Sequence, residues 1–72
     1  MKTLDLHGIQ HAAVQCRVED FIFSQDTPLK VITGNSSRMQ ELVMQILDRH
    51  NFAYHYENDY NLGSLIIVEK TR

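Results

Sequence analysis

An acid and a histidine stand close together near the start of the chain, in Leu4-Asp5-Leu6-His7-Gly8. The alternation places the two leucines on one face of a strand and Asp5 and His7 on the other. Gly8 then ends the strand, and a helical pattern begins almost at once. Because open α/β sheets bind ligands at the carboxyl ends of their strands, this pair is a candidate for acid–base chemistry.

His7 could act as a general acid or base, since imidazole titrates near neutral pH. Asp5 could orient that ring or act on an attacking hydroxyl. Side chains two residues apart on a strand are roughly 6.5–7 Å apart at the backbone, so direct contact depends on rotamers. The alternative is that both side chains hydrogen-bond neighbouring loops and only stabilise the fold.

A second strand-to-helix junction follows the strand predicted over residues 29–33. Backbone N–H groups at a helix start, together with the helix dipole, can hold a phosphate oxygen. If the two strands are adjacent and parallel, both junctions meet at one edge. Alternatively, Ser36 or Ser37 simply caps a helix and Arg38 points into water. The predicted phosphate-binding residues are Gly8, Thr33, Gly34, Asn35, Ser36, Ser37 and Arg38.

Asp5, His7 and His11 could in principle ligate zinc or manganese. Gly8 interrupts the backbone between the two histidines, so helical spacing of the ligands is not assured. We therefore expect no metal site and no cofactor. His50 is expected to complement a helix dipole, and His55 to lie on a strand surface.

Two apolar stripes predict the helices, and three further segments predict strands around 29–33, 52–57 and 65–68. The continuous apolar run at 65–68 is typical of a strand in the middle of a sheet. The order β-α-β-α-β-β over residues 1–72 predicts one two-layer α/β domain, with a four-stranded mixed sheet and both helices on one face. The stripes are Val14, Val18, Phe21 and Ile22, and then Met39, Leu42, Val43, Ile46 and Leu47.

The alternating residues Phe52, Tyr54 and Tyr56 could stack on bases, but we favour a core position with the hydroxyls at its edge. A second apolar strip on the first helix is a candidate contact for a homodimer or a protein partner. The alternative is that the two ends of this strip tuck under loops. The strip comprises Ile9, Ala12, Cys16 and Phe23.

The composition restricts the class of partner. The formal net charge is −2, and the seven Lys and Arg residues form no run. This charge distribution excludes strong binding of a polynucleotide through a continuous basic surface, but it allows a local positive patch.

Apolar residues make up 43% of the chain, which is enough for a small core, and the single cysteine suits a reducing compartment. With no apolar run long enough for a signal or membrane segment, we expect a cytoplasmic protein without membrane contact.

Three segments together resemble the small MutS-related (Smr) domain family over nearly the whole chain. The opening Leu4-Asp5-Leu6-His7-Gly8 matches the LDLHG motif of the family. The segment Val31-Ile32-Thr33-Gly34-Asn35-Ser36 stands where the family has its second motif, a strand ending in His-Gly-x-Gly or Thr-Gly-x-Gly. The closing Gly63-Ser64-Leu65-Ile66-Ile67-Val68 resembles the terminal glycine and apolar strand of the family.

The resemblance implies a fold similar to the C-terminal domain of translation initiation factor three. It also implies nucleic acid as partner, since many Smr domains nick DNA or cleave RNA, some at stalled ribosomes. We therefore expect an endonuclease with Asp5 and His7 as catalytic residues, RNA being favoured over DNA and the ribosome a candidate partner. Ser36 replaces the last glycine of the second motif, and the chain lacks the usual basic character. These departures motivate the alternative, a non-catalytic adaptor or regulatory protein that binds a ribosomal or other protein partner.

Overall fold

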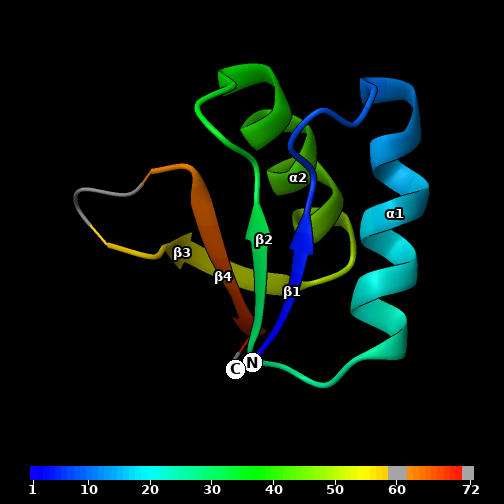
Figure 1. Ribbon diagram of the computed structural model, residues 1–72. Helices are drawn as coiled ribbons and strands as arrows, with labels where there is room; N and C mark the ends of the chain where they lie inside the picture. The colour runs from blue at the N-terminus through cyan, green and yellow to red at the C-terminus, as the bar shows by residue number, and fades with distance from the viewer. Residues whose placement is uncertain (59–61, 71–72) are drawn as a thin grey trace.

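The chain alternates strands and helices and then ends in two consecutive strands (Figure 1). The computed structural model describes residues 1–58 and 62–70. The predicted order β-α-β-α-β-β is confirmed, although the predicted turn over 58–63 lies partly outside the described residues. The elements are β1 (Lys2–Asp5), α1 (His11–Ser24), β2 (Leu29–Ile32), α2 (Ser37–Arg49), β3 (Phe52–Tyr56) and β4 (Ser64–Glu69).

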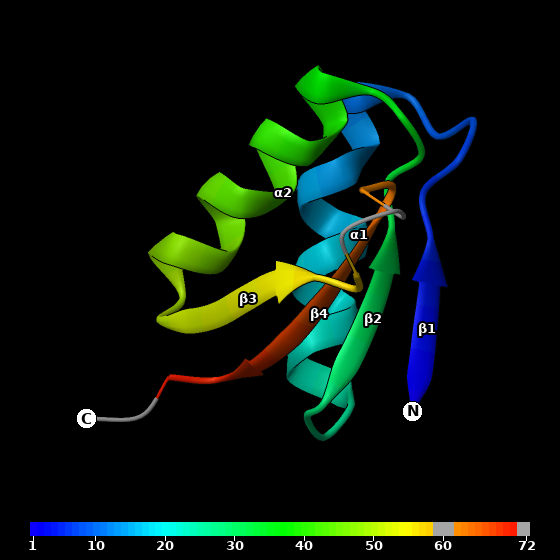
Figure 2. The same cartoon turned by 90° about the vertical axis from the view of Figure 1, so that its left-hand side faces the viewer.

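The four strands form one mixed sheet in the order β1-β2-β4-β3. β1 pairs parallel with β2, and β4 pairs antiparallel with both β2 and β3. The predicted adjacency of the first two strands and the central position of the last strand are therefore confirmed. Both helices cover the same face of the sheet, which gives the predicted α/β sandwich with two layers (Figure 2). Within residues 1–58 and 62–70, no helix lies over the other face.

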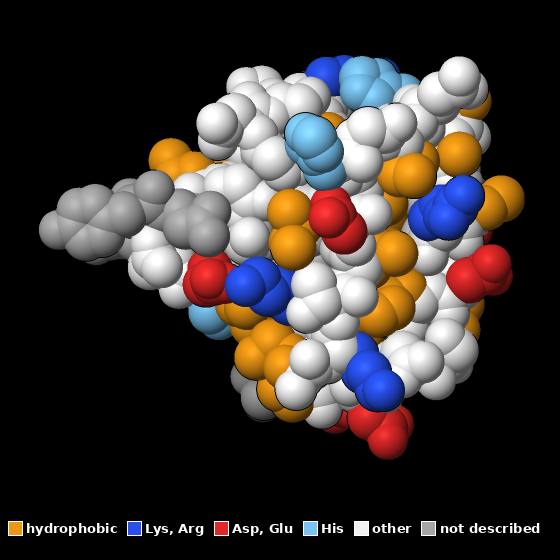
Figure 3. All heavy atoms as spheres, viewed as in Figure 1, with side chains coloured by type: hydrophobic (Ala, Val, Ile, Leu, Met, Phe, Trp, Pro, Cys, Tyr) orange, Lys and Arg blue, Asp and Glu red, His pale blue; other side chains and the backbone are white. Residues whose placement is uncertain are grey.

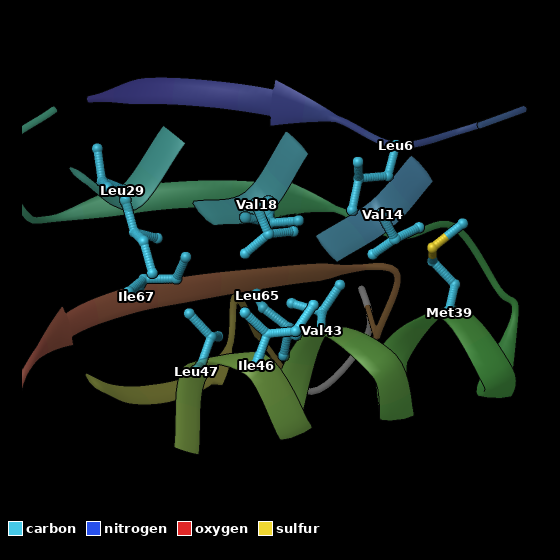
Figure 4. Close-up of a cluster of buried hydrophobic side chains, with 12 residues drawn as sticks. Leu6, Val14, Val18, Leu29, Met39, Val43, Ile46, Leu47, Leu65 and Ile67 are labelled. Carbon is cyan, nitrogen blue, oxygen red and sulfur yellow. The ribbon is translucent and has the colours of Figure 1, made fainter. Parts of the chain in front are cut away.

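The core fills the space between the sheet and the two helices (Figure 4). Leu29 and Val31 of β2 and Leu65 and Ile67 of β4 point into it, as strand alternation requires. The two predicted helix stripes are confirmed, with Phe21 and Leu42 packed at the margin of the core. The helices contribute the buried side chains Val14, Val18 and Ile22, and then Met39, Val43, Ile46 and Leu47.

The aromatic residues of β3 lie on the helix-covered side of the sheet. Phe52 and Tyr54 pack against the core, as predicted, and the Tyr54 hydroxyl donates a 3.0 Å hydrogen bond to the Asp48 carboxylate. Burial raises the pKa of Tyr54, and the bond to Asp48 adds to the rise. Tyr56 is more exposed, and its hydroxyl donates to Gln40 of α2. These contacts keep the β3 aromatics away from the open face of the sheet, where bases would stack.

His50 joins the two helices. It caps the C-terminal end of α2, and its Nε2 lies 2.8 Å from a carboxylate oxygen of Glu19 in α1. The His50 ring also meets the Phe23 ring edge to face, with centroids 4.9 Å apart. The bond from His50 lowers the pKa of Glu19. The prediction for His50 concerned only the dipole of its own helix and did not include this contact between the two helices. His55 is exposed on β3, as expected.

None of the helices in the described part of the chain is both long enough and apolar enough to cross a membrane.

Candidate nucleic-acid site at the ends of the parallel strands

A tight turn follows β1 and presents His7 to solvent. β1 ends at Asp5, so the strand is shorter than the alternation predicted. The Ile9 N–H donates a 3.0 Å hydrogen bond to the Leu6 carbonyl, which closes a turn with His7 and Gly8 at its centre. Gly8 has a φ of 79°, the left-handed conformation required at the third residue of a type II turn. The histidine is consequently lifted out of the sheet and is exposed.

Asp5 fixes the backbone of this turn. Its Oδ1 accepts a 2.9 Å hydrogen bond from the His7 N–H, and the carboxylate is exposed. The register pairs Asp5 with Ile32, so its side chain is on the sheet face that the helices leave open. The hydrogen bond that the structure shows is to the histidine backbone and not to its ring. Asp5 therefore positions the imidazole through the turn.

The turn after β2 lies directly beside His7. Gly34 has a φ of 68°, and a Cβ built on it would lie 3.8 Å from Cδ2 of the His7 ring. Parallel pairing of β1 with β2 brings the two turns to the same edge of the sheet. The predicted convergence of the two junctions is therefore confirmed.

Part of the predicted phosphate site is used inside the protein. The N–H groups of Thr33 and Gly34 donate to the Gly63 carbonyl at 2.7 and 3.0 Å. The Thr33 hydroxyl is buried and shares its proton between the carbonyls of Gly34 and Gly63. The expectation that these groups bind phosphate must be corrected, because the loop before β4 already occupies them.

The start of α2 also differs from the predicted anion site. The Ser36 hydroxyl accepts a 3.1 Å hydrogen bond from the Met39 N–H, so Ser36 is the helix cap. The Arg38 guanidinium pairs with Glu41 at 3.2 Å on the exposed helix surface. Both observations favour the simpler alternative for these two residues. Asn35 and Ser37 are exposed, and the N–H groups of the first helical turn at Ser37 and Arg38 have no partner within the helix.

The capping role predicts a difference between two variants of Ser36. Ser36→Ala removes the acceptor for the Met39 N–H and is expected to lower the free energy of unfolding by about 1 kcal/mol. Ser36→Gly, which introduces the glycine of the Smr motif, is expected to lower it by only a few tenths. Urea unfolding of both variants measures this difference. Equal losses in the two variants would contradict the capping role.

A residue that the sequence did not indicate holds the second turn in place. Gln40 of α2 donates from Nε2 to the Leu62 carbonyl at 2.8 Å and to the Gly34 carbonyl at 3.2 Å. It therefore ties the turn after β2 to the loop before β4. A glutamine on a helix is ordinarily solvated, so no local pattern could have identified this role.

The edge next to His7 collects the N-terminal ends of both helices, as the upper part of Figure 1 shows. Neither α1 nor α2 has an acidic residue in its first turn, and the N-cap of α1, Gln10, makes no side-chain capping bond. No acidic side chain of either first turn offsets the positive ends of the helix dipoles, and only α2 has a side-chain cap, from Ser36. Figure 3 shows histidine side chains at the upper edge of the open face, with an acidic side chain directly below one of them and Lys or Arg atoms only at the rim behind. The favourable potential for an anion at this edge therefore comes from the two helix N-termini.

Lys30 of β2, whose position in the sheet faces the open side, forms an ion pair with Glu57 beside β3. Within residues 1–58 and 62–70, no group of three or more His, Cys, Asp and Glu side chains is arranged to hold a metal ion. No protein-family model, no curated protein and no solved structure matches this chain.

Proposed function

We propose that this chain is an Smr-like endonuclease that binds nucleic acid and acts preferentially on RNA. One observation carries the proposal: the exposed His7 imidazole lies against Gly34, where two adjacent parallel strands end. The resemblance of residues 4–8, 31–36 and 63–68 to the Smr motifs supports the same reaction class. The helix N-termini beside His7 supply the positive potential that a phosphodiester needs.

The proposed reaction needs one proton acceptor close to the phosphodiester. His7 takes the proton from a ribose 2′-hydroxyl, whose oxygen then attacks the adjacent phosphorus. The bond between phosphorus and the 5′ oxygen breaks, and that oxygen is protonated from solvent or by the imidazolium formed in the first step. The products are a 2′,3′-cyclic phosphate and a 5′-hydroxyl end. Asp5 holds the turn, and the two helix ends stabilise the charge that develops on the phosphoryl oxygens.

The nucleophile explains the preference for RNA, because DNA lacks the 2′-hydroxyl. The test is to incubate the purified protein with end-labelled single-stranded RNA, the matching DNA, and RNA with one 2′-deoxy position, each with and without EDTA. We expect cleavage of RNA that persists in EDTA, leaves cyclic phosphate ends and stops at the deoxy position. Cleavage of DNA at the same rate, or a complete loss of activity in EDTA, would contradict the proposed reaction.

A second candidate function is that of a non-catalytic adaptor for a ribosomal or other protein partner. It is favoured by the internal use of Thr33, Ser36 and Arg38, which leaves fewer groups for phosphate. The test is co-sedimentation with purified ribosomes after nuclease treatment, using wild type and the Asp5→Ala/His7→Ala double variant. Equal binding by both proteins, together with no RNA cleavage, would favour the adaptor over the nuclease.

A further inference from the structure

The exposed face of α1 carries a large apolar side chain with little cover. Phe23 is 66% exposed, although its ring touches the edge of His50. Ala12 and Cys16 are also exposed. They lie on the same side of the helix as Phe23, because residues four and eleven positions apart fall on one helix face. We call Ala12, Cys16 and Phe23 the α1 strip. An exposed phenylalanine next to further apolar surface is typical of a contact site.

A cavity of about 220 Å³ opens beside the α1 strip, between α1 and α2. Val14, Leu42 and Ile46 provide apolar surface within it. Small-molecule sites usually enclose about 300–1,000 Å³, so this cavity suits one large side chain better than a metabolite. Its remaining lining residues are His11, Ala12, Gln15, Gln45 and Arg49.

We propose that the chain forms a twofold symmetric dimer, in which Phe23 of each copy enters the cavity between α1 and α2 of the other. A projecting side chain and a matching hollow on one surface are what an isologous contact requires. The two α1 helices would cross antiparallel, with Phe23 of one copy opposite Ala12 of the other. These two residues are separated along one helix by about 16 Å, at 1.5 Å per residue.

The charges along α1 favour this antiparallel arrangement. The helix has no acidic residue in its first turn and no basic residue in its last. Asp20 is exposed in its second half, where Glu19 is already paired with His50 of the same copy, whereas Arg49 borders the cavity near its start. Antiparallel contact therefore sets Asp20 of one copy toward Arg49 of the other, and it opposes the two helix dipoles. The same arrangement leaves the open face of the sheet and His7 free.

Cys16 provides a built-in probe of this arrangement. It is exposed, and it lies near the midpoint between Ala12 and Phe23. In the dimer, the two Cys16 residues would be offset by about 4.5 Å along the helix axes. A short bis-maleimide reagent is therefore expected to join two copies through Cys16. A parallel or end-to-end contact would place these thiols much farther apart.

The test is sedimentation equilibrium of the wild-type chain and three variants over a wide concentration range. Phe23→Asp removes the projecting ring, and Ala12→Arg blocks the cavity; both residues are exposed, so circular dichroism should show an intact fold. We expect each variant to raise the dimer dissociation constant at least tenfold and to reduce cross-linking. Leu62→Ser removes a 48% exposed side chain elsewhere and should change neither result.

Three outcomes would overturn the proposal. The first is a wild-type chain that stays monomeric at every concentration, and the second is a dimer that Phe23→Asp leaves unchanged. The third is a dimer weakened equally by Leu62→Ser, which would indicate general hydrophobic association. None of these measurements involves nucleic acid, so the dimer and the proposed nuclease activity can fail independently.

Discussion

His7→Ala is expected to lower the rate of RNA cleavage by about 10²–10⁴-fold, the usual contribution of a general acid–base group. The reason is chemical, since the His7 ring lies beside Gly34 in the turn after β2, and histidine is the side chain that most often acts as a general acid or base. His7 is exposed, so its replacement should leave the fold intact. Single-turnover cleavage of a labelled RNA measures the effect.

The matched control is His55→Ala. His55 is also an exposed histidine, but it lies on β3, where its Nδ1 meets the Tyr56 carbonyl. We expect its removal to change cleavage less than twofold. A similar loss in both variants would mean that the histidines act only through general charge. Activity in His7→Ala equal to that of the wild type would rule out the proposed role of this imidazole.

Two variants of Asp5 separate positioning from chemistry in the same assay. Asp5→Asn keeps a side-chain oxygen that can accept the His7 N–H, whereas Asp5→Ala removes it. If Asp5 acts by positioning, Asp5→Asn should remain active and Asp5→Ala should lose activity. If both variants lose the same activity, the carboxylate charge takes part in the reaction.

Gly63→Ala is expected to lower the free energy of unfolding by about 1–3 kcal/mol, as overpacking of a tight site does. A Cβ at this position would lie 3.2 Å from the carbonyl carbon and oxygen of Gly34, and backbone atoms cannot rotate away as a flexible side chain can. The methyl group would push the loop off the turn and strain the bonds from Thr33 and Gly34 to the Gly63 carbonyl. In a domain of this size, the melting temperature should fall by about 4–8 °C for each kcal/mol.

Thermal and urea unfolding measure this loss, with Leu62→Ala as control. Leu62 is the neighbouring residue and is 48% exposed, and its truncation adds no atom beside Gly34, so it should cost less stability than Gly63→Ala. Gly63→Ala should also reduce RNA cleavage at temperatures where it remains folded, because the loop holds the turn that lies beside His7. A Gly63→Ala protein as stable as the Leu62→Ala control would show that the loop can move away without cost.

The fold was predictable because its signals are local. Helix and strand periodicities identified the stripes that now form the core, and the continuous apolar run indicated the central strand β4. Adjacent parallel strands then required the two strand-to-helix junctions to meet, which placed His7 beside Gly34. The end of β1 was less predictable, because the hydrogen bond from the His7 N–H to Asp5 begins a turn where the alternation still continues.

Contacts between residues far apart in the sequence decide which polar groups at the site are already hydrogen-bonded within the protein. Thr33 is bound to Gly63, 30 positions later in the chain, and Gln40 reaches Leu62 across 22 positions. His50 is likewise held by Glu19, 31 positions earlier. Periodicity describes which way a residue faces along its own element, but it contains no information on which loop will fold over it.

Residue order and type alone therefore determined the architecture and the meeting of Asp5, His7 and Gly34 at one edge. Tertiary packing decided which donors at that edge are already bound within the protein, and it left Phe23 exposed on α1 and a cavity between α1 and α2. The physical reason is that secondary structure follows from local backbone and burial preferences. The satisfaction of each polar group depends instead on whichever partner the folded chain brings within hydrogen-bond distance.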